Sequence, residues 1–492
     1  MTELATNLRR VAIDPLSRVE GHGKVTLLLD ENNHVQQARL HIVEFRGFEK
    51  FVQGRPYWEI PVMVQRLCGI CPVSHHLAAC KAMDQVVGAD RLTSSAEKLR
   101  RLMHYGQILQ SHALHFFHLS SPDLLFGFGS DVAKRNIVGI ATEYPEIARQ
   151  GVLLRKYGQE VIRHTAGKRI HGTGAIPGGV NKNLNKEERD ALLADIYQII
   201  AWCRDAVAMA RRLFEQDPAL YNEFGRFSAN SLGLIRADGA MDLYHGGLRA
   251  RDRDGKTLFD HENYDEYWEH IYEDVKSWSY MKFPFLRQLG ADDGWYRVGP
   301  LTRVTQCDFI PTPLADVERR EFLAWDGGRA AGATLGTHWA RMIEMLHAAE
   351  AIKELLHDTD LLGDDLIVQG ERRGRGVGVL EAPRGTLIHH YRVDENDLVI
   401  RANLIVSTTH NNQAMNEAIR SVARQYLDGQ ELTEGLLNHI EVAIRAFDPC
   451  LSCATHALGK MPLTLNLIDA EGNEIDRLVR NGQGECSTGI CD

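Results

Sequence analysis

The chain has 492 residues, and its 56 basic and 66 acidic residues give a formal net charge of −10 at pH 7. No polybasic run appears, so charge argues against nucleic acid and anionic membrane surfaces as partners. No stretch approaches eighteen continuous apolar residues, and nine cysteines without a disulfide-like framework suit a reducing compartment, so we expect a cytoplasmic protein with no membrane span.

Predicted elements begin with a β-hairpin, because residues 24–30 and 35–43 are β-rich runs separated by a polar turn. Capping boxes at Ser94 to Glu97 and at Asn185 to Glu188 predict helices over residues 94–119 and 185–216. Residues 229–312 give no clear element. The remaining predicted elements are helices over residues 335–356, 411–427 and 433–447 and a hairpin formed by 463–468 and 474–479.

No internal repeat, low-complexity tract or linker divides the chain. We therefore expect an α+β, mainly helical fold, in which a single large domain has a central helix bundle and peripheral β-hairpins or small sheets.

Two Cys-x-x-Cys pairs stand near opposite ends of the chain, Cys68 with Cys71 and Cys450 with Cys453. Two intervening residues let both sulfurs of a pair reach one metal or two neighbouring metals. A local zinc knuckle would keep its pairs close in sequence, and a thioredoxin-like dithiol would need a βαβ setting. The spacing therefore predicts a metal site inside the fold.

The surrounding motifs resemble those of a known family. The segments Arg66-Leu-Cys68-Gly-Ile-Cys71-Pro-Val-Ser-His75 and Asp448-Pro-Cys450-Leu-Ser-Cys453-Ala-Thr-His456 resemble the two signature motifs of the large, catalytic subunit of NiFe hydrogenases. Further matches follow in order: Arg18-Val-Glu20-Gly-His22, Arg46-Gly-Phe-Glu49, Ser111-His-Ala-Leu-His115-Phe-Phe-His118 and Ala382-Pro-Arg384-Gly385. The second signature is similar to that of the cytoplasmic, NAD-reducing (bidirectional) branch.

The resemblance implies a nickel ion held by four cysteines, with Cys68 and Cys450 terminal and with Cys71 and Cys453 bridging to an iron that carries CO and cyanide. Two divalent ions would neutralise four thiolates, and soft sulfur suits nickel and low-spin iron. A tetrahedral zinc ion would satisfy the same ligand count.

The resemblance also assigns residues around the metals. Glu20 is similar to the glutamate that accepts a proton from the terminal thiolate, here Cys450, although by itself it reads as an ordinary loop carboxylate; His22 would support it or fill the core. Arg384 would place a permanent charge over the metals and donate to a diatomic ligand. The residues of the surrounding shell would be Thr408, His75 and His115.

A magnesium site is implied at Glu49, the backbone carbonyl of Leu404 and His456. Without the resemblance, Glu49 would be expected to pair with Lys50 or Arg55.

Other candidate ligands have ordinary interpretations. His112, His115 and His118 fall on one predicted helix and are expected to pack rather than to ligate a metal directly. The remaining cysteines are predicted to be buried small residues, Cys80, Cys203 and Cys307, or to lie in a disordered tail, Cys486 and Cys491.

The function implied is reversible heterolytic cleavage of H2 into protons and electrons. This chain has no further cysteine quartet, so electrons would pass to an iron–sulfur small subunit, and then to diaphorase subunits that bind FMN and NAD; no NAD site is expected here. The alternatives are a zinc-stabilised protein and a complex-I-like electron-transfer subunit that is not a hydrogenase. Family members are loaded by metal-insertion proteins and cut by a maturation protease, which implies a domain of residues 1–456 and a removable extension of residues 457–492.

Overall fold

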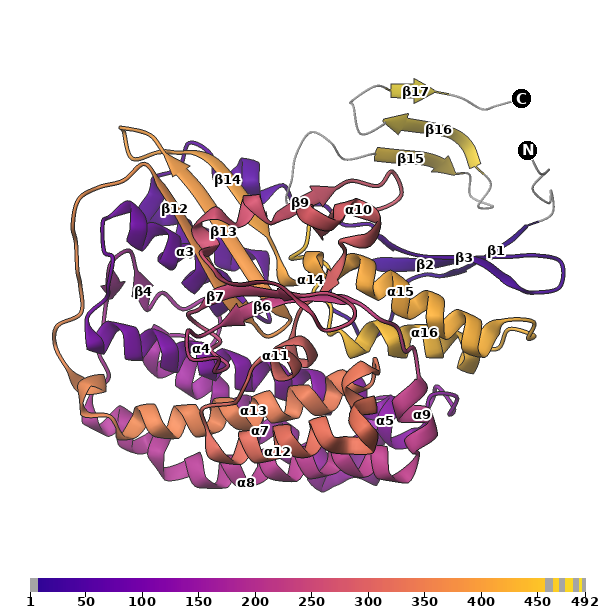
Figure 1. Cartoon of the computed structure of the whole chain (residues 1–492), viewed down its shortest axis with the longest axis horizontal. Coiled ribbons are helices and arrows are strands. Elements are labelled where there is room, and N and C mark those ends of the chain that lie inside the picture. Colours follow the sequence, from indigo (N-terminus) through magenta and orange to yellow (C-terminus); the bar gives the residue numbers. More distant parts are fainter. Residues whose placement is uncertain (1–7, 456–462, 469–473, 481–485, 489–492) are drawn as a thin grey trace.

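The computed structural model describes residues 8–455, 463–468, 474–480 and 486–488. Long helices lie together along one side of the molecule, and small sheets with shorter helices lie along the other (Figure 1). The prediction of a mainly helical α+β chain with small sheets is confirmed. Within the ranges just given, no helix combines the length and the apolarity that a bilayer crossing requires.

The central helix of the bundle is α13, which packs against three of the other four bundle helices and is buried along nearly its whole length. Its buried residues include the charged Arg341 and Glu344 as well as apolar side chains, so α13 lies inside the core with these charges enclosed. The bundle consists of α4 (Ser94–Leu114), α7 (Pro145–Ala166), α8 (Lys186–Gln216), α12 (Pro313–Ala324) and α13 (Gly336–His357).

The predicted helix starts are borne out to within a residue. The capping box at the start of α8 is present, with the Asn185 side chain accepting the Glu188 N–H and the Glu188 side chain accepting the Asn185 N–H. The box predicted at Ser94 is wrong, because Thr93 caps α4 by accepting the Ala96 N–H. A π-helical turn, His115–Ser120, carries α4 on into α5 (Ser121–Phe126).

Helices α4 and α7 approach closely because glycines face each other where they touch. A Cβ atom added at Gly158 would lie 2.6 Å from the carbonyl oxygen of Gly106. The absence of a side chain therefore sets the distance between these two helices.

A three-stranded antiparallel meander lies against the helix α3 (Pro72–Val86) and was not predicted from the sequence. Its strands are β12 (Arg375–Ala382), β13 (Gly385–Val393) and β14 (Val399–Ile405). Gly376 and Gly378 face α3, where a Cβ atom would lie 1.8 and 2.0 Å from carbonyl oxygens of that helix. These glycines therefore allow a strand to lie directly on a helix.

The predicted N-terminal hairpin is confirmed as β2 (Gly23–Leu29) and β3 (Val35–Ile42), and β1 (Arg9–Ile13) adds a third strand. The unassigned region 229–312 contains mostly short strands. These are β6 (Asn230–Ile235), β7 (Gly247–Arg251), β8 (Thr257–Glu262) and β11 (Tyr296–Arg297) in one sheet, and β9 (Ile271–Asp274) with β10 (Phe283–Leu286) in another.

The C-terminal helices are confirmed as α15 (Asn412–Val422), extended by a π-helical turn to Leu427, and α16 (Glu434–Ala446). The final hairpin is β15 (Leu463–Ile468) with β16 (Glu474–Arg480); its turn lies outside the described residues. Cys486 begins β17 (Cys486–Thr488), which pairs with β16, so the prediction of a disordered tail is wrong there, and Cys491 lies outside the described residues. The remaining elements are α1 (Phe48–Phe51), α2 (Ile60–Met63), α6 (Ile137–Glu143), α9 (Pro218–Glu223), α10 (Gly290–Asp293), α11 (Pro300–Gln306), α14 (Ser407–His410), β4 (Ala175–Ile176) and β5 (Gly179–Val180).

We expect the Gly158→Ala substitution to lower the free energy of unfolding by about 1–3 kcal/mol, because the added methyl group has no space between α4 and α7. The apparent melting temperature from scanning calorimetry measures this loss. Gly129→Ala is the control, because a Cβ atom at Gly129 meets no atom within 4 Å. Equal melting temperatures of the two variants would contradict the packing explanation.

Candidate metal centre

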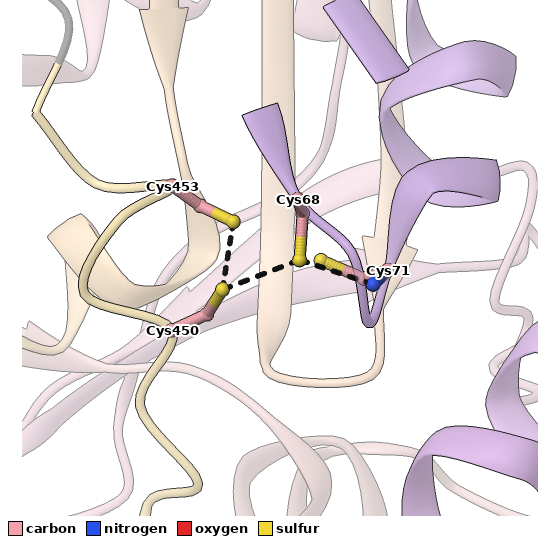
Figure 2. A group of neighbouring side chains, drawn as sticks. All are labelled: Cys68, Cys71, Cys450 and Cys453. Atoms are coloured by element: carbon pink, nitrogen blue, oxygen red, sulfur yellow. Dashed lines mark hydrogen bonds between the residues drawn. The ribbon is translucent and has the colours of Figure 1, made fainter. Parts of the chain in front are cut away.

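The two cysteine pairs meet in the interior of the molecule (Figure 2). Their four Sγ atoms all lie within 4.8 Å of one another, with 3.3 Å between Cys68 and Cys450 and 2.7 Å between Cys450 and Cys453. Every one of these side chains is buried, none more than 5% exposed, and none forms a disulfide. The convergence predicted from the sequence is therefore present in the structure.

Backbone pairing between the two ends of the chain brings the second cysteine pair into place. Glu20 and Cys450 form a parallel β-bridge, in which the Leu451 N–H donates to the Glu20 carbonyl at 2.9 Å. Gly21 has φ +84°, and a Cβ atom there would lie 2.6 Å from the Ser452 nitrogen. Only glycine allows this close approach, which explains the residue that follows Glu20.

Two glutamines hold the turn of the first pair. The side-chain amides of Gln107 and Gln110, one turn apart on α4, donate to the Ile70 carbonyl at 2.8 and 2.7 Å. The turn thereby presents Cys71 at the start of α3, and the amides of Ile70 and Cys71 donate to Cys68 Sγ at 3.2 and 3.1 Å. The sequence analysis did not identify either glutamine, because no sequence motif marks a glutamine that binds a distant backbone carbonyl.

The Glu20 carboxylate touches the second pair directly. Cys450 Sγ donates to Glu20 Oε2 at 2.9 Å, the Ser452 N–H donates to the same oxygen at 3.2 Å, and the Ser452 hydroxyl donates to Oε1. Glu20 is partly buried, so it links the buried sulfur to a more accessible position. His22 neither supports Glu20 nor fills the core: its side chain is 74% exposed and pairs with Glu44.

Arg384 reaches the cysteines from the turn between β12 and β13. Its Nε and Nη2 donate to the carbonyl and the carboxylate of Asp448 at 2.5 and 3.1 Å. Nη1 is buried and has no hydrogen-bond partner among the described residues. Burial by itself lowers the pKa of Arg384, but the charges of Asp448 and the nearby cysteines raise it well above its usual value, so the guanidinium stays charged.

The pKa values of the neighbouring thiols shift in opposite directions. Hydrogen bonds from Cys450, Cys453 and Cys68 lower the pKa of the Cys71 thiol well below its ordinary value. Burial raises the pKa of Cys450 and of Cys453 well above theirs. A metal that binds here must therefore displace protons from the remaining thiols, which couples its affinity to pH.

The residues assigned to the surrounding shell do not all lie at the metal cavity. Thr408 lines the cavity, and its hydroxyl oxygen accepts the Cys450 N–H at 3.0 Å, which leaves its hydrogen free to donate. His75 also lines the cavity, with Nδ1 3.1 Å from His389 Nε2. His115 instead lies 2.6 Å from the Arg445 carbonyl and stacks on His338.

The structure brings together two of the three residues assigned to magnesium. The Leu404 N–H donates to Glu49 Oε1 at 2.8 Å, and burial raises the pKa of Glu49. Within the described part of the chain Glu49 forms no ion pair with Lys50 or Arg55. His456 lies outside the described residues, immediately after Thr455, whose carbonyl accepts the Arg46 N–H two residues before α1.

The other candidate ligands pack as ordinary core residues. His112 bonds the buried Glu344 at 2.8 Å, and His118 is partly buried. Cys80, Cys203 and Cys307 are buried apart from the quartet, and burial raises the pKa of Cys80 to about 12 and that of Cys307 to about 11.

The donor set of this cavity suits soft metal ions. Four buried thiols converge here, and a buried guanidinium N–H without an acceptor among the described residues belongs to Arg384, which lines the same cavity. A tetrahedral zinc site would account for the sulfurs and leave that donor unexplained.

Comparisons with known proteins agree with this geometry. Residues 46–126 and 235–456 match the family model described as nickel-dependent hydrogenase, and residues 10–45 match a HoxL-like model. The chain is 49% identical over 487 residues to the NAD-reducing hydrogenase HoxS subunit beta of Cupriavidus necator, an alignment that covers 96% of this chain and all of that one. It is 41% identical over 477 residues to a component of the F420-non-reducing hydrogenase of Methanothermobacter thermautotrophicus, an alignment that covers 95% of this chain and all of that one.

A solved structure is similar throughout. The crystal structure of an NAD+-reducing NiFe hydrogenase in the H2-reduced state superposes with a TM-score of 0.90 at 59% identity, covering 91% of this chain and 99% of the other. The NiFeSe hydrogenase of Desulfovibrio vulgaris Hildenborough, at 24% identity and a TM-score of 0.74 over 92% of this chain and all of the other, shares the fold.

Proposed function

The chain belongs to the nickel-dependent hydrogenase family, and from the cysteine cavity we propose that it is the catalytic subunit in which H2 is reversibly split into protons and electrons. The observation that carries the proposal is the buried four-sulfur cluster with a carboxylate in contact with one of its thiols. The zinc-stabilised and complex-I-like alternatives are not favoured, because the relatives are hydrogenases and all four cysteines are present.

We propose that Cys68 and Cys450 bind nickel terminally and that Cys71 and Cys453 bridge it to an iron that carries CO and cyanide. The two metals, when bound, supply the electrophilic site that polarises H2 and accepts its electrons. Arg384 Nη1 would then donate to an anionic ligand of the iron, and the Thr408 hydroxyl to a second one. The surrounding protein excludes water and fixes the sulfur positions.

The proton would leave through this chain's own side chains. Cys450 Sγ accepts the proton and passes it to Glu20 Oε2, to which it is already hydrogen-bonded at 2.9 Å. The Ser452 N–H and hydroxyl hold the carboxylate so that it faces the sulfur. Because Glu20 is partly exposed, the proton can continue to solvent or to a partner.

The electrons would leave through partner subunits. Among the described residues, one group of thiols has the spacing of metal ligands, and it is the cysteine quartet proposed to bind nickel and iron. Iron–sulfur clusters would therefore be carried by a partner subunit. The relative with 49% identity is named an NAD-reducing hydrogenase, which supports diaphorase partners that carry FMN and NAD and a cytoplasmic location for the complex.

We further propose a magnesium ion held by Glu49, the Leu404 carbonyl and His456. The contact between Glu49 and Leu404 supports this assignment. Metal-insertion proteins and a protease that removes residues 457–492, leaving a domain of residues 1–456, would complete the mature subunit.

Purified enzyme is predicted to contain nickel and iron in equal amounts, with infrared absorption from CO and cyanide. The Cys450→Ser substitution removes a soft ligand and is expected to abolish both signals, whereas Cys203→Ala, a change at a buried cysteine apart from the quartet, retains them. Elemental analysis and infrared spectroscopy measure the outcome. Zinc as the only bound metal would rule out the proposed function.

The Glu20→Gln substitution keeps the shape of the side chain and removes its proton-accepting carboxylate. We expect nickel and iron to remain bound while H2/D2O exchange falls at least ~100-fold, the size of a general acid–base contribution. Glu44→Gln, which removes a carboxylate from the same end of the chain, serves as the control. Unchanged exchange in Glu20→Gln would show that another group carries the proton.

The Glu49→Gln substitution is predicted to remove magnesium and to leave nickel and iron in place, because the amide is a weaker ligand for a hard cation. Elemental analysis of the same preparations gives all three metals. The exposed Glu59→Gln is the control. Magnesium retained in Glu49→Gln would contradict this ligand assignment.

A further inference from the structure

A second cleft, with a volume of about 910 Å3, lies on the face of the β12–β14 meander turned away from α3. Its other wall includes residues of the 3-10 turn Tyr264–Glu269 and of β9. None of its lining residues lines the cysteine cavity, but Glu49, proposed above as a magnesium ligand, is one of them, so the cleft is separate from the cysteines and shares one residue with the magnesium site.

Three arginines form a row across this face, one on each strand (Figure 1 shows the three strands). Arg375 is directly opposite Arg392, and Arg392 is directly opposite Arg401. Like charges that face each other across a β-ladder destabilise the sheet. In a chain with net charge −10, such a row needs an explanation.

The protein balances the charge of the row only in part: burial raises the pKa of Glu49 in the same cleft, and the charges of Lys282 and Arg401 oppose that shift. Within the described part of the chain, none of these arginines takes part in an ion pair. Two acidic groups of the cleft pair with lysines, Glu273 with Lys282 at 2.9 Å and Asp274 with Lys276 at 2.5 Å, while Glu49 accepts the Leu404 N–H and forms no ion pair with the three arginines.

The pKa of His390, which lines the same cleft from β13, also reflects the positive charge of the row. Burial, and then the charges of Arg375, Arg392 and Arg401, lower its pKa to about 4, so the ring is neutral at pH 7. Asn403 donates to the Tyr267 hydroxyl oxygen at 2.7 Å, and that hydroxyl lies 3.3 Å from His390 Nδ1. The other ring nitrogen, Nε2, is buried and has no hydrogen-bond partner among the described residues.

We propose that this cleft binds a small anion with two or more linked phosphate groups, held by Arg375, Arg392 and Arg401. Neighbouring strands lie about 4.8 Å apart, so the row extends over roughly 10 Å. One phosphate reaches two guanidinium groups, and a diphosphate reaches all three. Arginine presents paired N–H donors that match phosphate oxygens, and bound phosphate removes the repulsion along the row.

Pyrophosphate is the probe for this site, titrated calorimetrically into the full chain without added metal. We expect one site per chain, with orthophosphate bound at least tenfold more weakly. Arg392→Gln removes the central charge and should weaken pyrophosphate binding at least tenfold. The control Arg212→Gln makes the same change on an exposed arginine of α8 and should leave it unchanged.

The melting temperature provides a second measurement that does not depend on affinity. Without pyrophosphate, Arg392→Gln should melt no lower than the parent chain, because a repulsive charge is lost. With pyrophosphate, the parent should be stabilised and the variant should not. A lower melting temperature of the variant in both conditions would show that Arg392 is structural and would overturn the proposal.

Three other results would also overturn it. If pyrophosphate does not bind, the cleft is not an anion site. Equal weakening in Arg392→Gln and Arg212→Gln would show only non-specific attraction. Binding to the free chain that disappears in the complex assembled with partner subunits would show that an acidic protein surface covers the cleft. The proposal is independent of the hydrogenase function, so nickel and iron content and H2/D2O exchange should be the same in both variants.

Discussion

The metal centre depends on one backbone contact, the short β-bridge between the segment around Glu20 and the segment that carries Cys450 and Cys453. This contact positions two sulfurs opposite the pair beside α3 and places a carboxylate against one of them. Gly21 makes the approach possible, since any side chain there would push the strands apart. Ligand geometry and the proton path therefore rest on the same few backbone atoms.

Electrostatics explains why so many polar groups are buried around the sulfurs. Thiolates without counter-charges are costly in an interior, and neighbouring thiols share protons until metals replace them. Arg384 supplies a permanent charge, and Asp448 binds two of its three guanidinium nitrogens, so that the third, Nη1, stays available to donate. One arginine cannot balance the charge of four thiolates, so bound metal ions would have to balance the rest.

Residues whose chemistry depends on identity and spacing could be predicted from the sequence, and residues defined by packing could not. The cysteine spacing led to the quartet, and the box at Asn185 gave the start of α8. The meander β12–β14 was missed because its strands are buried on most positions, so alternation is absent, and because its glycines resemble those of a loop. Gln107 and Gln110 were missed because their role is to donate to the Ile70 carbonyl, which only the folded chain brings near them.

The separation of the two cysteine pairs along the chain also orders events during biosynthesis. A ribosome releases Cys68 and Cys71 early, and it has translated more than nine-tenths of the chain before Cys450 appears. Until the last segment docks beside Glu20, the nascent protein offers an incoming ion half of its sulfur ligands, and afterwards the pocket is sealed. For metals that reach the cysteines from solution, this burial favours loading while the late segment is still undocked.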